Sequence, residues 1–142
     1  MIETERLILR KHALDDFEPA FAMYSDPKVV RHIGDGKPGT RQDVWFRLLR
    51  FAGHWQLLGY GLFAVVEKAS GCFIGEVGLA DFHRGLGDDF DPFPEAAWIM
   101  ASSAHGQGFA TEAMDAAFWV ILGLGSSTCM GKHQSLQVDA DP

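Results

Sequence analysis

The chain has 142 residues, of which 47% are hydrophobic, and this is enough for one domain with a single core. Its 19 acidic and 12 basic side chains leave a formal net charge of -7, and the basic residues form no run, so we expect neither a nucleic acid nor an anionic membrane as partner. The sequence contains no run of about 20 apolar residues and does not begin like a signal peptide, which predicts a cytoplasmic protein.

Histidine and cysteine spacing argues against a metal site. The six histidines lie in different segments, without the HxxxH or HxxH spacing that places two ligands on one helical face. Cys72 and Cys129 form no CxxC pair and are expected to be reduced thiols in the core. We therefore predict no bound metal.

The first elements are a short strand and a helix. Residues 6–10 alternate, with Leu7 and Leu9 on one side, as in a strand that buries one face. Apolar residues then recur at steps of three and four over 14–24, which predicts a helix, and Ser-Asp-Pro at 25–27 ends it.

A longer helix and a β-hairpin follow. Thr40 and Asp43 have the spacing of a capping box, and the apolar residues after them keep helical periodicity to Leu58. Two β-rich runs, 60–67 and 72–80, are separated by a four-residue link that contains a glycine. This pattern predicts an antiparallel hairpin.

The last predicted elements are a strand and an amphipathic helix. Residues 81–94 are rich in Gly, Pro and Asp and predict an exposed acidic loop, after which 95–100 reads as a strand. A third helix is expected from near Gly108 to about Ile121. Residues 126–142 show no periodicity and are expected to form an atypical tail.

The transition from strand to helix near Gly106 and Gly108 is the segment with the clearest chemistry. The first turn of a helix has free N–H groups and the positive end of the helix dipole, both of which attract phosphate oxygens. Glycine also allows the backbone to approach a ligand closely. Taken alone, however, two glycines can equally be plain turn residues.

Three segments together carry a family resemblance: Glu5 to Arg10, Ser70 to Leu79, and GQGFATEA at 106–113. In this order they resemble the ribosomal-protein-type branch of the GNAT N-acetyltransferases, over residues 1–122. The resemblance implies an α+β fold with a mixed, mostly antiparallel central sheet flanked by helices. The family signature, (Arg or Gln)-x-x-Gly-x-(Gly or Ala), places Ser103 at its first position, where this chain departs from the pattern.

The resemblance also implies acetyl-CoA as co-substrate, without a metal. Backbone N–H groups from His105 to Ala110 would bind its pyrophosphate, the strand from Trp98 to Met100 would pair with the pantetheine arm, and an amide near Met100 would stabilise charge on the thioester carbonyl. The implied cofactor-binding residues are Trp98, Ile99, Met100, His105, Gly106, Gln107, Gly108, Phe109, Ala110 and Thr111.

The implied reaction is direct acetyl transfer to a primary amine, either a protein N-terminus or a small amine. The amine must be neutral to attack, so a carboxylate is needed as base. Glu95, at the start of the fourth predicted strand, is the first candidate, and Glu76, in the third, is the second. A solvated carboxylate at a strand end without a catalytic role is an equally good interpretation of Glu95.

Relatives continue past the third helix into further strands and a helix, for which we recognise no counterpart. Residues 1–125 are therefore expected to form an incomplete acyl-CoA-binding domain that lacks the last strands and helix, followed by the tail 126–142. An open sheet edge can pair with a second copy, so a homodimer is one expectation. The alternatives are a catalytically weak or inactive acyl-CoA-binding remnant and, more remotely, a nicotinamide-dinucleotide protein, for which the third glycine of the fingerprint is missing.

Overall fold

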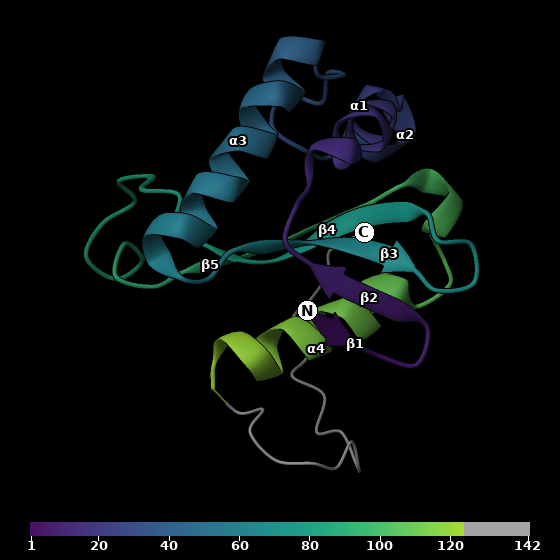
Figure 1. Ribbon diagram of the computed structural model, residues 1–142. Coiled ribbons are helices and arrows are strands. Elements are labelled where there is room, and N and C mark those ends of the chain that lie inside the picture. Colours follow the sequence, from purple (N-terminus) through teal and green to yellow (C-terminus); the bar gives the residue numbers. More distant parts are fainter. Residues whose placement is uncertain (124–142) are drawn as a thin grey trace.

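The computed structural model describes residues 1–123 and confirms the predicted α+β class (Figure 1). The five strands form one antiparallel sheet in the order β1-β2-β3-β4-β5. The predicted tail 126–142 lies outside the described residues. In chain order the elements are β1 (Ile2–Glu3), β2 (Leu7–Arg10), η1 (Leu14–Asp16), α1 (Phe17–Ser25), α2 (Pro27–Val30), α3 (Arg41–Leu58), β3 (Leu62–Glu67), β4 (Phe73–Ala80), β5 (Glu95–Met100), η2 (Ser102–Ala104) and α4 (Phe109–Ile121).

Helices cover both faces of the sheet. In Figure 1, α1, α2 and α3 lie above it and α4 lies below it. Leu7 and Leu9, which alternation placed on one side of the first strand, are fully buried in the cluster beneath the sheet together with Ala113 of α4. On the other face, Tyr24 of α1 and Ile99 of β5 belong to a second buried cluster.

Local sequence explains where the long helix begins and ends. The capping box is confirmed: the Asp43 N–H donates to Thr40 Oγ1 at 3.1 Å, and the Thr40 N–H donates to Asp43 Oδ2 at 2.9 Å. Gly59 ends α3 in the left-handed conformation, with φ of 75°, which glycine adopts without strain.

Three local expectations need correction. The sequence pattern did not reveal β1, a two-residue strand that pairs with β2 through Ile2 and Leu9. Pro27 does end α1, but it also begins α2, because proline is suited to the first turn of a helix and the Asp26 carboxylate accepts from the Lys28 N–H. Cys72 is exposed rather than buried, because it precedes β4 in the tight turn between the two strands of the hairpin.

The contact between β4 and β5 is unusually close at Gly75. A Cβ atom on this glycine would lie 2.5 Å from the Ile99 carbonyl oxygen and 2.5 Å from Met100 Sδ. The β5 strand can therefore pack tightly on β4 only because residue 75 has no side chain. Within residues 1–123, no helix is both long enough and apolar enough to span a membrane.

Candidate active site

The segment between β5 and α4 adopts a conformation that requires glycine at two positions. Gly106 and Gly108 have φ of 72° and 76°, in the left-handed region, and Gly108 is the N-cap of α4. A Cβ atom at Gly106 would contact nothing within 4 Å, so backbone conformation and not crowding selects glycine there.

This turn leaves a run of backbone donors without acceptors. No residue in the range 1–123 accepts a hydrogen bond from the six N–H groups of Gly106 to Thr111, and the first helical bond runs from the Glu112 N–H to the Gly108 carbonyl at 3.1 Å. The His105 N–H, which the predicted set included, donates to the Ser102 carbonyl at 3.2 Å in η2. Six consecutive N–H groups without acceptors at the positive end of a helix dipole can bind an anion.

An ion pair anchors the beginning of α4 to Arg6, the residue before β2. Arg6 Nε donates to Glu112 Oε2 at 2.7 Å, and Arg6 Nη1 donates to the Gln107 carbonyl at 2.8 Å. The Thr4 hydroxyl donates to Glu112 Oε1 at 2.5 Å. Burial alone would raise the pKa of Glu112, but the hydrogen bonds from Thr4 and Arg6 outweigh it and lower the pKa. The sequence pattern did not identify this anchor, because its partners lie about 106 residues apart.

The outer edge of β5 offers backbone groups beside the turn. The Ala101 N–H donates to the Ile74 carbonyl at 2.8 Å. Because inward and outward residues alternate in an antiparallel pair, Ile99 bonds to β4 whereas Trp98 and Met100 direct their N–H and C=O groups away from it. His105 Nε2 lies 2.9 Å from the Met100 carbonyl oxygen, on this outer side. Among the described strands, β5 is the last one at this edge of the sheet. The outward backbone groups of Trp98 and Met100 therefore have no described strand beside them, whereas those of Ile99 bond to β4.

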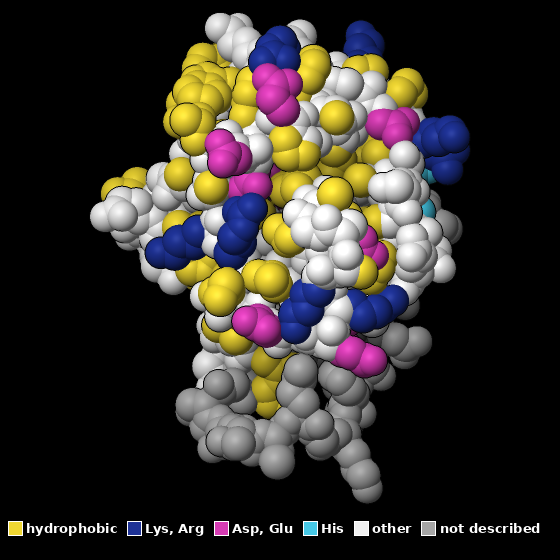
Figure 2. Space-filling model, turned by 45° about the vertical axis from the view of Figure 1, so that its right-hand side comes forward, with side chains coloured by type: hydrophobic (Ala, Val, Ile, Leu, Met, Phe, Trp, Pro, Cys, Tyr) yellow, Lys and Arg dark blue, Asp and Glu magenta, His cyan; other side chains and the backbone are white. Residues whose placement is uncertain are grey.

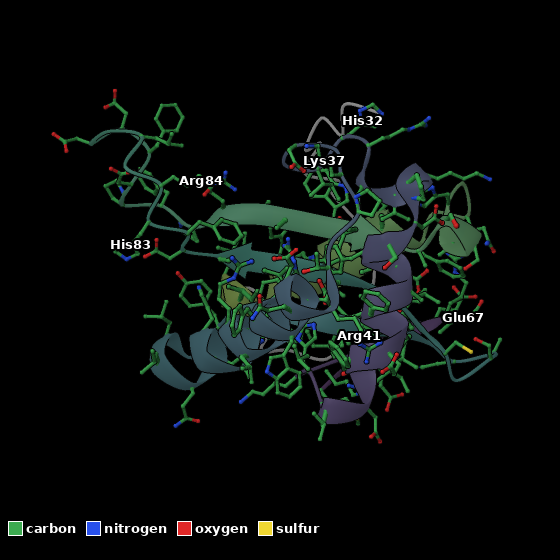
Figure 3. All side chains as sticks on the ribbon, turned by 90° about the horizontal axis from the view of Figure 1, so that it is seen from above. His32, Lys37, Arg41, Glu67, His83 and Arg84 are labelled. Carbon is green, nitrogen blue, oxygen red and sulfur yellow. The ribbon has the colours of Figure 1, made fainter. Side chains whose placement is uncertain are left out.

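Glu95 lies at the start of β5, in contact with solvent. Its carboxylate accepts from Arg84 Nε at 2.7 Å, and its side chain is 39% exposed. Both residues line a cavity of ≈ 130 Å³ formed mainly by the 81–94 loop. Figure 3 shows Arg84 where this loop returns to the sheet.

Glu76 is sealed in the core. The Tyr24 hydroxyl donates to Glu76 Oε2 at 2.5 Å, and His12 Nε2 lies 3.1 Å from Oε1, while the glutamate side chain is only 2% exposed. Burial, together with the nearby Glu76 charge, raises the pKa of Tyr24 well above 10. The carboxylate of Glu76 therefore links α1 to β4 and does not reach solvent.

The two candidate bases share one face of the sheet but do not meet. Glu76 lies opposite Ile99, which is four residues from Glu95 along β5, so the two carboxylates are roughly 13 Å apart at the backbone. Within residues 1–123, no three His, Cys, Asp or Glu side chains are grouped so that they could hold a metal ion. On the face drawn in Figure 2, basic side chains are scattered among acidic and apolar ones.

Comparison with known proteins shows which family this chain matches. Residues 6–134 match the model of the acetyltransferase (GNAT) domain. A Bordetella pertussis protein classed as a GnaT-family acetyltransferase is 32% identical, with a TM-score of 0.75, and the match covers 87% of this chain and 73% of that one.

Two further solved structures are similar. An acetyltransferase from Agrobacterium tumefaciens str. C58 is 26% identical, with a TM-score of 0.67, over 87% of this chain and 67% of its own. The Salmonella typhimurium protein yncA, classed as an acetyltransferase and solved with its cofactor acetyl-CoA, shares the fold at 20% identity and a TM-score of 0.52, over 75% of this chain and 58% of its own. Since the family model matches most of its length and the Bordetella pertussis protein is 32% identical, the chain belongs to the GNAT acetyltransferase family.

Proposed function

We propose that this protein is an N-acetyltransferase that transfers the acetyl group of acetyl-CoA to a primary amine. The observation that carries the proposal is the run of six unbonded amides from Gly106 to Thr111, directly after the open edge of β5. The relative yncA was solved with acetyl-CoA, which supports the same co-substrate here.

The residues present suit acetyl-CoA, which supplies an activated acetyl group as a thioester. The amides of Gly106 to Thr111 would hold the pyrophosphate, since they are both free and at the helix N-terminus. The outward backbone groups of Trp98 and Met100 would pair with the amides of the pantetheine arm. An outward N–H of this strand would also stabilise negative charge on the thioester oxygen.

We propose Glu95 as the general base. It is the only one of the two predicted carboxylates with access to solvent, and it lies at a cavity next to β5. A base must come within hydrogen-bond reach of the amine or of one bridging water. Both oxygens of Glu76 are occupied in the core by Tyr24 and His12, which favours a structural role for that residue.

The assignment of the family branch and of the acceptor amine rests on the sequence. The segments 5–10, 70–79 and 106–113 resemble the ribosomal-protein-type branch, whose acceptor is a protein N-terminus, and a small amine would use the same chemistry. A homodimer that paired through the outer edge of β5 would occupy the groups proposed for pantetheine. Light scattering with and without acetyl-CoA tests this: the co-substrate should shift any such dimer to monomer.

Calorimetric titration with acetyl-CoA, followed by thiol-release assays on a panel of amines, tests the function. We expect binding, turnover with at least one amine, and a loss of kcat of roughly 100-fold in Glu95→Gln. Glu67→Gln is the matched control. Glu67 is also a glutamate at one end of a strand, but it lies at the far side of the molecule from Arg84 (Figure 3). Binding without turnover on any amine would instead support the inactive remnant, and the absence of binding would refute the assignment of the turn.

A further inference from the structure

Two arginines on α3 have no acidic partner. Arg47 and Arg50 make no hydrogen bond or ion pair with any residue in 1–123, whereas Arg6, Arg41 and Arg84 each pair with a glutamate. Because residues three apart on a helix are neighbours, the two positive charges lie side by side. The carboxylates of Asp43 and Glu76 attract Arg47 and Arg50, respectively, but neither forms a hydrogen bond or ion pair with them, so both guanidinium groups keep their donors available for an anion.

Aromatic rings position both side chains, Arg47 beside Tyr24 and Arg50 beside Phe82. The Arg47 guanidinium carbon lies 4.4 Å from the centroid of the Tyr24 ring. The Arg50 guanidinium carbon is 5.9 Å from the Phe82 ring, and that of Arg84 is 5.0 Å from the same ring. Since Arg84 holds the Glu95 carboxylate, Phe82 bridges Arg50 and the proposed base.

The electrostatics of this cluster favour an added anion. Desolvation of the guanidinium, followed by repulsion from Arg47, lowers the pKa of Arg50, and Arg84 contributes in the same sense. The carboxylate of Glu76 acts on Arg50 from the core, but its two oxygens already interact with Tyr24 and His12. Neither arginine is buried, so both guanidinium groups are accessible to a ligand.

We propose that Arg47 and Arg50 bind the carboxylate of a free α-amino acid whose amine is the acetyl acceptor. This inference rests on the proposed function and specifies its substrate class. In the reaction the amine nitrogen bonds to the acetyl carbon, the carbon–sulfur bond breaks, and the thiolate leaves. The proton of the amine passes to Glu95 and then to the thiolate, which gives an N-acetyl amino acid and coenzyme A.

The chemistry distinguishes a free amino acid from a protein N-terminus. An α-amino acid carries its carboxylate one carbon from its amine, and the planar guanidinium fork matches a carboxylate in two hydrogen bonds. The first residue of a protein has a neutral amide at the same position. Such an acceptor would offer Arg47 and Arg50 no carboxylate to bind.

The test compares each amino acid with its own amide as acceptor, with acetyl-CoA as donor and thiol release as readout. We expect kcat/KM for the acid to exceed that for the amide by roughly 10- to 100-fold. This is the factor expected when one or two charge-assisted hydrogen bonds to the carboxylate are lost. Arg47→Gln and Arg50→Gln should each raise KM for the acid, change kcat little, and reduce the preference for the acid by about 10-fold. Arg50→Lys, which keeps the positive charge, should retain part of the preference for the acid.

Arg41→Gln is the control, because Arg41 is on the same helix but pairs with Glu18, and it should keep the full preference. Unfolding temperatures of all variants identify any that fail to fold. If the wild type prefers amides or peptides, or if both glutamine variants keep the preference for the acid, the anion site is refuted while acetyl transfer stands. Acetyl-CoA binding without transfer to any amine would refute the proposed function itself, and this inference with it.

Discussion

Arg6 and Glu112 join the first long strand of the sheet to the first turn of the last described helix. Arg6 Nε lies 2.7 Å from Glu112 Oε2, the Arg6 N–H donates to Glu112 Oε1 at 3.0 Å, and the Arg6 guanidinium carbon lies 4.4 Å from the Phe109 ring. The arginine also bonds to the Gln107 carbonyl, within the turn that carries the free amides. One pair thus fixes both the packing of α4 and the shape of the proposed phosphate site.

The low pKa of Glu112 predicts a stability that depends on pH. Its stabilising contribution is complete above the unfolded pKa of about 4.3 and is lost as the pH falls through the lower folded pKa. Glu112→Gln should therefore lower the free energy of unfolding by about 1–2 kcal/mol at pH 7, and the difference from wild type should shrink below pH 4. Urea denaturation across pH measures it. Glu5→Gln, which changes an exposed neighbour of Arg6, is the control and should leave the free energy of unfolding within about 0.5 kcal/mol of wild type.

Removal of the Arg6 guanidinium should weaken co-substrate binding more than it slows turnover. Without its bond to the Gln107 carbonyl, the turn loses its fixed shape, and the site loses a positive charge. For Arg6→Gln we expect the Kd for acetyl-CoA to rise by roughly 5- to 50-fold with kcat within a few fold, measured by calorimetry and steady-state kinetics. An unchanged Kd in a folded variant would show that the turn keeps its shape without the anchor.

Gly75 should tolerate no side chain. In Gly75→Ala the added methyl would overlap the Ile99 carbonyl oxygen and Met100 Sδ, so β5 must move away from β4. We expect a loss of about 2–4 kcal/mol in the free energy of unfolding, by chemical denaturation. Gly71→Ala is the contrasting variant: its Cβ meets nothing within 4 Å, and only its left-handed φ of 69° opposes the change, at about 1 kcal/mol.

Tyr24 should not ionise while the protein is folded. The chain has two tyrosines, so in Tyr60→Phe the absorbance change of phenolate at 295 nm reports Tyr24 alone. Because its folded pKa is raised, the neutral phenol stabilises the fold up to about pH 10, and this contribution is lost as the pH rises further. We expect the absorbance to change only together with unfolding seen by circular dichroism. A reversible titration near pH 10 in the folded state would contradict the buried Tyr24–Glu76 contact.

Local sequence was sufficient for most elements of the fold, although not for β1 and α2. Alternation over 6–10, helical spacing after Thr40 and the glycines at 106 and 108 depend on interactions within a few residues, and the structure has the strand, the helix and the left-handed turn in those places. The family resemblance came from three segments together, 5–10, 70–79 and 106–113, each of which is recognisable from its own residues. The assignment of the site residues remains a prediction.

Tertiary structure alone decided how separate segments combine. It made Glu76 a buried partner of Tyr24 and His12 while Glu95 stayed exposed, although both had the same status as carboxylates in strands. It also brought Arg6 to Glu112, whereas Arg47 and Arg50 form no ion pair with a carboxylate of residues 1–123. The physical reason is that the charge state and accessibility of a side chain depend on its neighbours in space, and these come from residues up to 108 positions away, beyond any local pattern.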